Sequence, residues 1–134
     1  MSEATTLAPG LTGRAEARVA ESDLAHSVGS GDVTVYATPR LAALMESAAI
    51  DSLQGVLEED QTTVGSRLDL SHLAPTPVGA RVRAEARLET VEAKKLRFSI
   101  TAFDEGEKIG EASHERIIVS REKFTARAEE KKGS

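Results

Sequence analysis

The stretch that decides the fold reads TPRLAALMESAAIDSL and runs from Thr38 to Leu53. Thr38 is a good N-cap residue, and Pro39 suits the first position of a helix, where its missing N–H group costs no hydrogen bond. Gly55 follows the stretch as a helix-stop residue. The sequence therefore predicts one long helix from 38 to 53.

Glu46 lies on the wrong side of this predicted helix. At about 100° per residue, Arg40, Ser47 and Asp51 fall on one narrow polar stripe, whereas Glu46 falls among apolar residues. A carboxylate on an apolar surface is costly to bury unless it has a partner or a chemical task. A salt-bridged glutamate and a catalytic glutamate both fit this pattern.

The composition is that of one soluble domain. The chain has 134 residues, of which 40% are hydrophobic, 29% charged and only 3% aromatic. Because there are no cysteines, disulfides, thiolate metal sites and a cysteine nucleophile are excluded. The N-terminus lacks the pattern of a secretory signal, and no run of about 18 apolar residues could span a bilayer. We therefore expect a cytoplasmic protein with no membrane partner.

The net charge of −5 and the scarcity of aromatic residues argue against a nucleic-acid partner. Three arginines, Arg81, Arg83 and Arg87, form a row on one predicted strand, but glutamates interrupt it. A solvated sheet face and a contact with ligand phosphates both remain open for this row.

Apolar and polar residues alternate over most of the remaining chain, which predicts strands. The pattern is weak at 14–20 and clear in four later segments, at 62–73, 81–91, 96–102 and 109–119. Short turns at 92–95 and 104–106 are typical of hairpins. Consecutive strands with half-polar faces favour antiparallel pairing, so the predicted class is α+β.

We divide the chain into a flexible N-terminal arm (1–13), a folded domain (14–127) and a flexible charged tail (128–134). The predicted helix is apolar on nearly every side, so the sheet must wrap it or a second subunit must cover it.

Two further residues carry potential chemistry. His72 shares a strand face with Leu68 and Leu70, which points it toward the helix and toward Glu46. A satisfied core histidine and one half of an acid/base pair are both open for His72. Thr38 adds a hydroxyl at the helix start, where simple capping and stabilisation of an oxyanion are both open.

The remaining histidines, His26 and His114, give weaker signals, and neither has a metal-ligand spacing. We therefore expect no metal.

Several segments together resemble the single-domain hotdog-fold thioesterases related to fluoroacetyl-CoA thioesterase. The resemblance covers roughly 14–127 and is carried by Gly29–Glu46, Gly65–His72, Thr76–Gly79, Ile109–Gly110, His114–Arg116 and Glu122–Phe124.

This resemblance implies a hotdog fold, an antiparallel sheet wrapped around one long central helix, and a homodimer. It also implies hydrolysis of an acyl-CoA, or a related acyl thioester, to a carboxylic acid and a free thiol. The catalytic roles then fall on Thr38, Glu46 and His72. The predicted substrate-binding residues are Gly65, which would lie against the acyl group, Tyr36 and Arg116. We expect no cofactor, since CoA is part of the substrate.

The sequence departs from the family before the helix, where 29–34 lacks the aromatic lid of the fluoroacetyl-specific enzyme, and at Ser47. These changes argue against fluoroacetyl selectivity and leave thioester hydrolysis in place. Two other functions stay open: a non-catalytic hotdog protein that binds acyl-CoA or another small ligand, and a hotdog dehydratase or isomerase.

Overall fold

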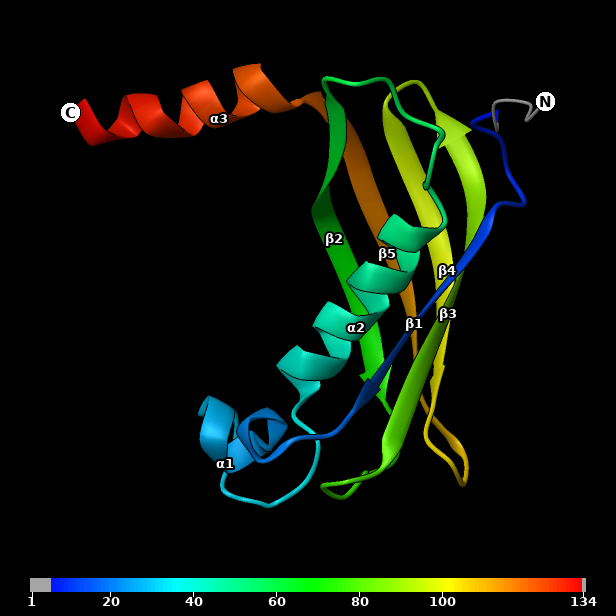
Figure 1. The fold of residues 1–134 in the computed structure, drawn as a ribbon, viewed down its shortest axis with the longest axis vertical. Helices are drawn as coiled ribbons and strands as arrows, with labels where there is room; N and C mark the ends of the chain where they lie inside the picture. The colour runs from blue at the N-terminus through cyan, green and yellow to red at the C-terminus, as the bar shows by residue number, and fades with distance from the viewer. Residues whose placement is uncertain (1–5, 134) are drawn as a thin grey trace.

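The computed structural model describes residues 6–133. Five strands and one long helix form the body of the domain, with short helical segments between them and a helix after the last strand (Figure 1). In chain order the elements are β1 (Thr12–Arg18), η1 (Glu21–Asp23), α1 (Ala25–Val28), α2 (Thr38–Asp51), β2 (Gln61–His72), β3 (Arg81–Glu92), β4 (Lys95–Phe103), β5 (Lys108–Ser120), α3 (Arg121–Glu129) and η2 (Glu130–Gly133).

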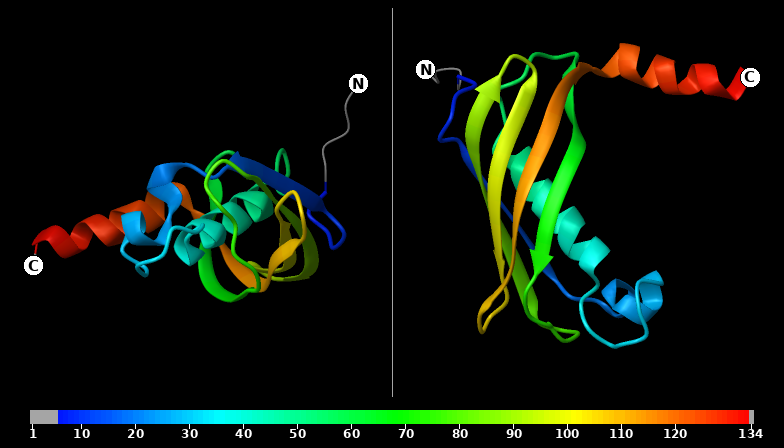
Figure 2. Two further views of the ribbon diagram at one scale, coloured as in Figure 1. Left: turned by 90° about the horizontal axis from the view of Figure 1, so that it is seen from below. Right: turned by 180° about the vertical axis from the view of Figure 1, so that it is seen from behind.

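The sheet is antiparallel throughout and has the strand order β1-β3-β4-β5-β2. It curls around α2, which is clearest in the end-on view of Figure 2. The predicted α+β class and the wrapped central helix are therefore confirmed. In the sheet of one chain, β1 and β2 are the two edge strands.

Helix α2 buries one face against the concave side of the sheet. Its fully buried residues are Leu41, Met45, Ala48 and Ala49, and the sheet supplies small or branched partners such as Ala84 and Ile100. Full burial of one large aliphatic side chain contributes about 1.5–3 kcal/mol, so this face holds helix and sheet together.

Strand β1 crosses the last turn of α2 at very short range. A Cβ atom on Gly13 would collide with the backbone of Ala48 and Ser52. Only glycine fits there, because the colliding atoms belong to the backbone and cannot rotate away. Gly13 thus lets the edge strand close over the helix.

Both ends of α2 differ from the predicted helix. The N-cap is Ala37, and Thr38 is the first helical residue, so its hydroxyl does not cap the helix. The prediction of Thr38 as N-cap is wrong, and this hydroxyl is free for another contact. The helix ends at Asp51 with Ser52 as C-cap, before Gly55, which lies in a later turn with a φ of 74°.

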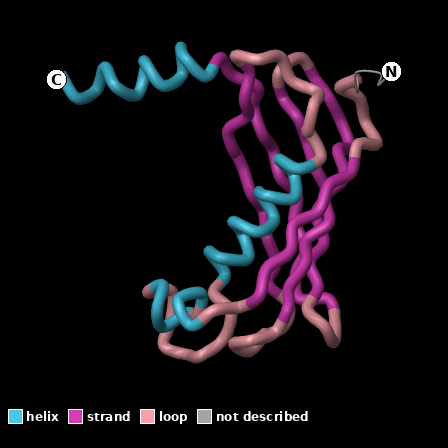
Figure 3. The backbone as a smooth tube through the Cα atoms, viewed as in Figure 1, coloured by secondary structure: helices cyan, strands magenta, loops and turns pink. Residues whose placement is uncertain are grey.

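The ends of the domain also differ from the predicted boundaries. Strand β1 begins at Thr12, inside the predicted arm, and α3 continues past residue 127. Residues 1–5 of the predicted arm and Ser134 of the predicted tail lie outside the described residues. Helix α3 has no buried residue and projects away from the sheet (Figures 1 and 3).

Most of the loops gather at the two ends of the sheet, as the tube in Figure 3 makes plain. The segment between β1 and α2 is the longest of them and carries η1 and α1, which the sequence did not predict. Within residues 6–133, no helix has the length and apolar character needed to cross a membrane.

Candidate active site

The N-terminal turn of α2 and the end of β2 meet at Thr38 and His72. Thr38 Oγ1 lies 2.8 Å from His72 Nδ1, a hydrogen-bond distance. The other ring nitrogen, His72 Nε2, is buried and has no hydrogen-bond partner among residues 6–133. A buried polar atom without a partner is costly, so Nε2 is a natural contact for a ligand.

Burial lowers the pKa of His72 below its usual value. The imidazole is therefore neutral near pH 7 and carries one N–H group. A neutral ring held by Thr38 can offer Nε2 to a substrate atom.

A cavity of about 330 Å³ opens beside this pair. Its walls are largely apolar and come from the segment before α2 and from the loop after β2, including Val33, Val35, Tyr36, Leu73 and Pro75. Val33 and Leu73 are each about half exposed, at 53%. An exposed apolar rim around a polar pair suits an acyl chain better than a charged ligand.

Tyr36 forms part of the wall of this cavity, and its hydroxyl is already engaged in a hydrogen bond within the chain. It is only 4% exposed, and its hydroxyl donates to the carbonyl oxygen of Arg40 at 3.2 Å. Burial, together with the nearby Asp23 carboxylate, raises the pKa of Tyr36 to about 12. Tyr36 is thus a neutral wall residue at the predicted site, and its contact with substrate stays a prediction.

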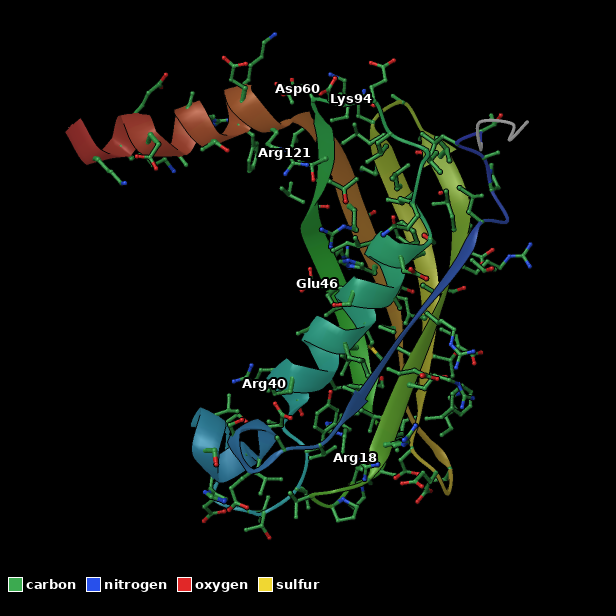
Figure 4. All side chains as sticks on the ribbon, viewed as in Figure 1. Arg18, Arg40, Glu46, Asp60, Lys94 and Arg121 are labelled. Carbon is green, nitrogen blue, oxygen red and sulfur yellow. The ribbon has the colours of Figure 1, made fainter. Side chains whose placement is uncertain are left out.

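A second group surrounds Glu46, between α2 and β2 (Figure 4). Arg116 Nη1 donates to Glu46 Oε2 at 3.1 Å, and His114 Nε2 lies 3.9 Å from the same oxygen. The Glu46 side chain is 40% exposed, whereas Arg116 and His114 are buried. The structure therefore supports both interpretations of Glu46: it has an ion-pair partner, and it remains accessible.

Gly65 makes room for this carboxylate. A Cβ atom at position 65 would lie 2.6 Å from Glu46 Oε2 and 3.4 Å from both Arg116 Nη1 and His114 Cε1. The glycine lies against Glu46, so any larger residue would displace the carboxylate. Contact of Gly65 with an acyl group stays a prediction.

The predicted site residues therefore form two groups in one chain. Thr38 and His72 make one group, and Glu46, Gly65 and Arg116 make the other. Among residues 6–133, no hydrogen bond joins Glu46 to His72 or Thr38. Glu46 lies eight positions after Thr38, which corresponds to a rise of about 12 Å along the helix. The acid/base pairing expected for Glu46 and His72 is thus not formed within one chain.

Sequence reasoning missed His114, which is 2% exposed and lies next to Arg116 and Glu46. The signal was present in the alternation of β5, where Gly110, His114, Arg116 and Ile118 are all buried on the face toward α2. His114 and Arg116 occupy alternate positions that face the core, and two polar residues at such positions indicate a buried polar cluster.

Within residues 6–133, no group of three acidic or histidine side chains is arranged to hold a metal ion. The chemistry available here is that of a carboxylate, an imidazole, a hydroxyl and a guanidinium.

Comparison with known proteins places this geometry in a family. The model of the fluoroacetyl-CoA-specific thioesterases matches residues 19–122. A fluoroacetyl-CoA thioesterase from Streptantibioticus cattleyicolor is 34% identical over 97 residues, which cover 72% of this chain and 70% of that protein.

Solved structures agree. A mutant of the fluoroacetyl-CoA thioesterase in complex with acetyl-CoA is 26% identical, with a TM-score of 0.87 over 92% of this chain and 97% of that one. A thioesterase superfamily member from Thermus thermophilus is 29% identical, with a TM-score of 0.86 over 99% of this chain and 96% of that one. The predicted hotdog fold and thioester hydrolase activity are confirmed: this chain belongs to the fluoroacetyl-CoA-specific thioesterase family.

Proposed function

We propose that this chain hydrolyses acyl-CoA thioesters with Thr38, Glu46 and His72, at a site that two copies of the chain build together. The observation that carries the proposal is the state of Glu46. Its carboxylate is 40% exposed on a helix that otherwise buries apolar residues there, and Arg116 binds only one of its two oxygens. The hydrogen bonds of residues 6–133 leave Oε1 free, so that this oxygen can reach water or substrate.

Glu46 would act on the carbonyl carbon of the thioester in one of two ways. As a general base, Oε1 takes a proton from a water molecule, which attacks the carbonyl carbon; as a nucleophile, Oε1 attacks that carbon itself and water then hydrolyses the resulting anhydride. In both routes the C–S bond breaks, the acyl group leaves as a carboxylic acid and CoA leaves as a thiol.

The Thr38–His72 pair would lie across the reacting carbonyl from Glu46 and contact the atoms on which negative charge develops. Thr38 holds the ring through Nδ1, and the unpartnered Nε2 is placed to contact the carbonyl oxygen or the departing sulfur. The N-terminus of α2 lies at this pair and favours the negative charge that develops on either atom.

A second chain would bring the two groups together. In one chain, β2 is an edge strand with a free side, and such edges invite pairing with another strand. Gly65, beside Glu46, and His72 are seven residues apart on β2. If β2 pairs antiparallel with its copy about a two-fold axis at Asp69, the irregularity between Gly65 and Arg67 brings Gly65 opposite the partner subunit's His72. Each of two sites would then combine Glu46 of one chain with Thr38 and His72 of the other.

No cofactor is required by this chemistry, because a thioester carbonyl is electrophilic enough to react with an activated water or a carboxylate. A cytoplasmic location and the absence of nucleic-acid and membrane partners rest on composition and remain proposals.

The test is release of free thiol from a panel of acyl-CoA substrates by the purified protein and by Glu46→Gln. We expect thiol from the wild type and nearly none from a folded Glu46→Gln protein, since the amide is neither a base nor a nucleophile. A wild type that binds acyl-CoA without releasing thiol would support the non-catalytic alternative. A product that keeps its CoA would support a dehydratase or isomerase.

A further inference from the structure

His114 is a buried histidine to which the proposed reaction gives no task. It lies on β5 with its ring turned toward Arg116, Glu46 and the backbone of β2, and Phe98 of β4 packs beside it with 6.1 Å between the ring centroids. Arg116 and Glu46 are the charged side chains that contact this ring.

We propose that His114 is a positioning residue that holds the Arg116 guanidinium in an orientation in which it binds only one oxygen of Glu46. The inference rests on the proposed function, since it explains how the second oxygen of Glu46 is kept free for the thioester.

The hydrogen bonds of His114 fix its tautomer. Nδ1 lies 2.7 Å from the carbonyl oxygen of Arg67, and a carbonyl only accepts, so Nδ1 carries the proton. In the neutral ring, Nε2 is then an acceptor, and Arg116 Nη1 donates to it at 3.1 Å. Burial is the main cause that lowers the pKa of His114, and the positive charge of Arg116 lowers it further, although the Arg67 carbonyl and Glu46 act in the opposite direction. The ring is therefore neutral near pH 7, as this bond requires.

The guanidinium of Arg116 is held on three sides. Nε donates to Thr63 Oγ1 at 2.8 Å, and Nη2 donates to the Thr63 carbonyl at 3.1 Å. The two hydrogens of Nη1 are divided between Glu46 Oε2 and His114 Nε2, both at 3.1 Å.

This division matters because arginine and carboxylate groups commonly form a fork with two parallel hydrogen bonds. A fork would occupy both oxygens of Glu46 and suppress its basicity. With one hydrogen of Nη1 bound to His114 and Nη2 bound to Thr63, Arg116 holds Glu46 through a single contact. Without the acceptor on His114, the guanidinium is free to turn toward the second oxygen.

Two substitutions separate the roles of the two ring nitrogens: the bond of Nδ1 to the Arg67 carbonyl and the acceptance by Nε2 of a hydrogen bond from Arg116. In His114→Asn, the amide nitrogen can take the place of Nδ1 and keep the bond to Arg67, but nothing reaches Arg116. In His114→Gln, the amide oxygen extends to the place of Nε2 and can accept from Arg116. His26→Asn is the matched control, because His26 is exposed on α1 and no side-chain hydrogen bond or ion pair within residues 6–133 joins it to either group of site residues.

We expect His114→Gln and His26→Asn to keep kcat close to wild type. In His114→Asn we expect kcat to fall about 10- to 100-fold with little change in KM, as is common when a reacting group is misplaced by a fraction of an ångström to an ångström. A role limited to stability would lower the amount of active protein in both His114 variants and would not separate Asn from Gln.

The proposed tautomer of His114 is tested independently of activity by the nitrogen chemical shifts of its ring in the wild-type protein. We expect a protonated Nδ1 and an unprotonated Nε2 at pH 7. The opposite tautomer, or equal kcat values for folded His114→Asn and His114→Gln, would overturn the inference.

A failure of the proposed function can be distinguished from a failure of the positioning role of His114. If the wild type releases no thiol, or if Glu46→Gln retains full activity, the function is wrong whatever the His114 tautomer is. If Glu46→Gln is inactive and His114→Asn is as active as wild type, only the positioning role is wrong.

Discussion

At the scale of single residues, the position of Glu46 on the apolar side of α2 is explained by side chains and space that other elements provide. Its carboxylate is accommodated by a glycine on β2 and bound by a buried arginine on β5. Gly65 therefore deserves a test of its own, because it contributes space and no chemistry.

We predict that Gly65→Ala lowers kcat/KM by about tenfold or more, since the new Cβ atom would lie 2.6 Å from Glu46 Oε2 and displace the carboxylate. The melting temperature should change little, because the displaced atoms are the end of a flexible side chain. Gly106→Ala is the control, since a Cβ there meets nothing closer than 3.6 Å. Equal activity of both variants would mean that Glu46 does not depend on this space.

The half-buried His72 and the buried His114 predict how the free energy of unfolding depends on pH. Burial lowers the pKa of both His72 and His114 in the folded state. The unfolded chain, in which histidine titrates near pH 6.5, therefore binds more protons as the pH falls below about 6.5. The free energy of unfolding should fall between about pH 6.5 and 5, above the range in which carboxylates titrate.

Urea unfolding at several pH values measures this dependence. His114→Gln should reduce the slope, because it removes one of the two groups. A stability that is constant over this range, or that rises as the pH falls, would contradict the burial of neutral histidines.

At the scale of elements, much of the fold could be predicted from patterns within short segments. The helix at 38–53 and the strands β3, β4 and β5 follow from apolar periodicity and from short hairpin turns. The contacts of His114 and Thr38 could not be predicted in this way. His114 contacts Glu46, which is far away in the sequence. The N-cap position of α2 is occupied by Ala37, so the Thr38 hydroxyl forms its hydrogen bond with His72 of β2 instead.

The crossing of β1 over α2 gives a prediction at this scale. Gly13→Ala should lower the free energy of unfolding by about 1–3 kcal/mol or more, because its Cβ atom would collide with the backbone of Ala48 and Ser52. Urea denaturation against Gly106→Ala measures the effect. If Gly13→Ala were as stable as the control, β1 would not lie this close to α2.

The segment before α2 predicts the acyl preference. Its cavity walls include Val33, Val35 and Tyr36, and residues 29–34 contain no aromatic side chain. In an apolar pocket one small group changes transition-state binding by only about 1–3 kcal/mol. Beyond their difference in intrinsic reactivity, acetyl-CoA and fluoroacetyl-CoA should therefore give similar kcat/KM values, and hexanoyl-CoA should give a higher one.

The check is kcat/KM for acetyl-, fluoroacetyl-, butyryl-, hexanoyl- and phenylacetyl-CoA under one set of conditions. A preference of several orders of magnitude for fluoroacetyl-CoA would mean that selectivity does not depend on an aromatic lid in this segment.

At the scale of the whole molecule, the central claim is that one active site combines Glu46 of one chain with the Thr38–His72 pair of another. The claim follows from the separation of the two groups along α2 and from the free edge of β2. Light scattering should accordingly give the mass of a dimer at micromolar concentration. Activity retained by a monomer would count against a shared site.

Subunit mixing tests this claim most directly. Glu46→Gln and His72→Ala are each expected to be inactive as pure homodimers. After equal amounts are mixed and allowed to exchange subunits, each mixed dimer should contain one site with both substitutions and one site with neither. Thiol release should then recover to about a quarter of the wild-type value, since half of the dimers are mixed in a random two-fold assembly. If mass measurements detect mixed dimers and thiol release stays at the level of the inactive parents, Glu46 and His72 do not act across the interface and the account is contradicted.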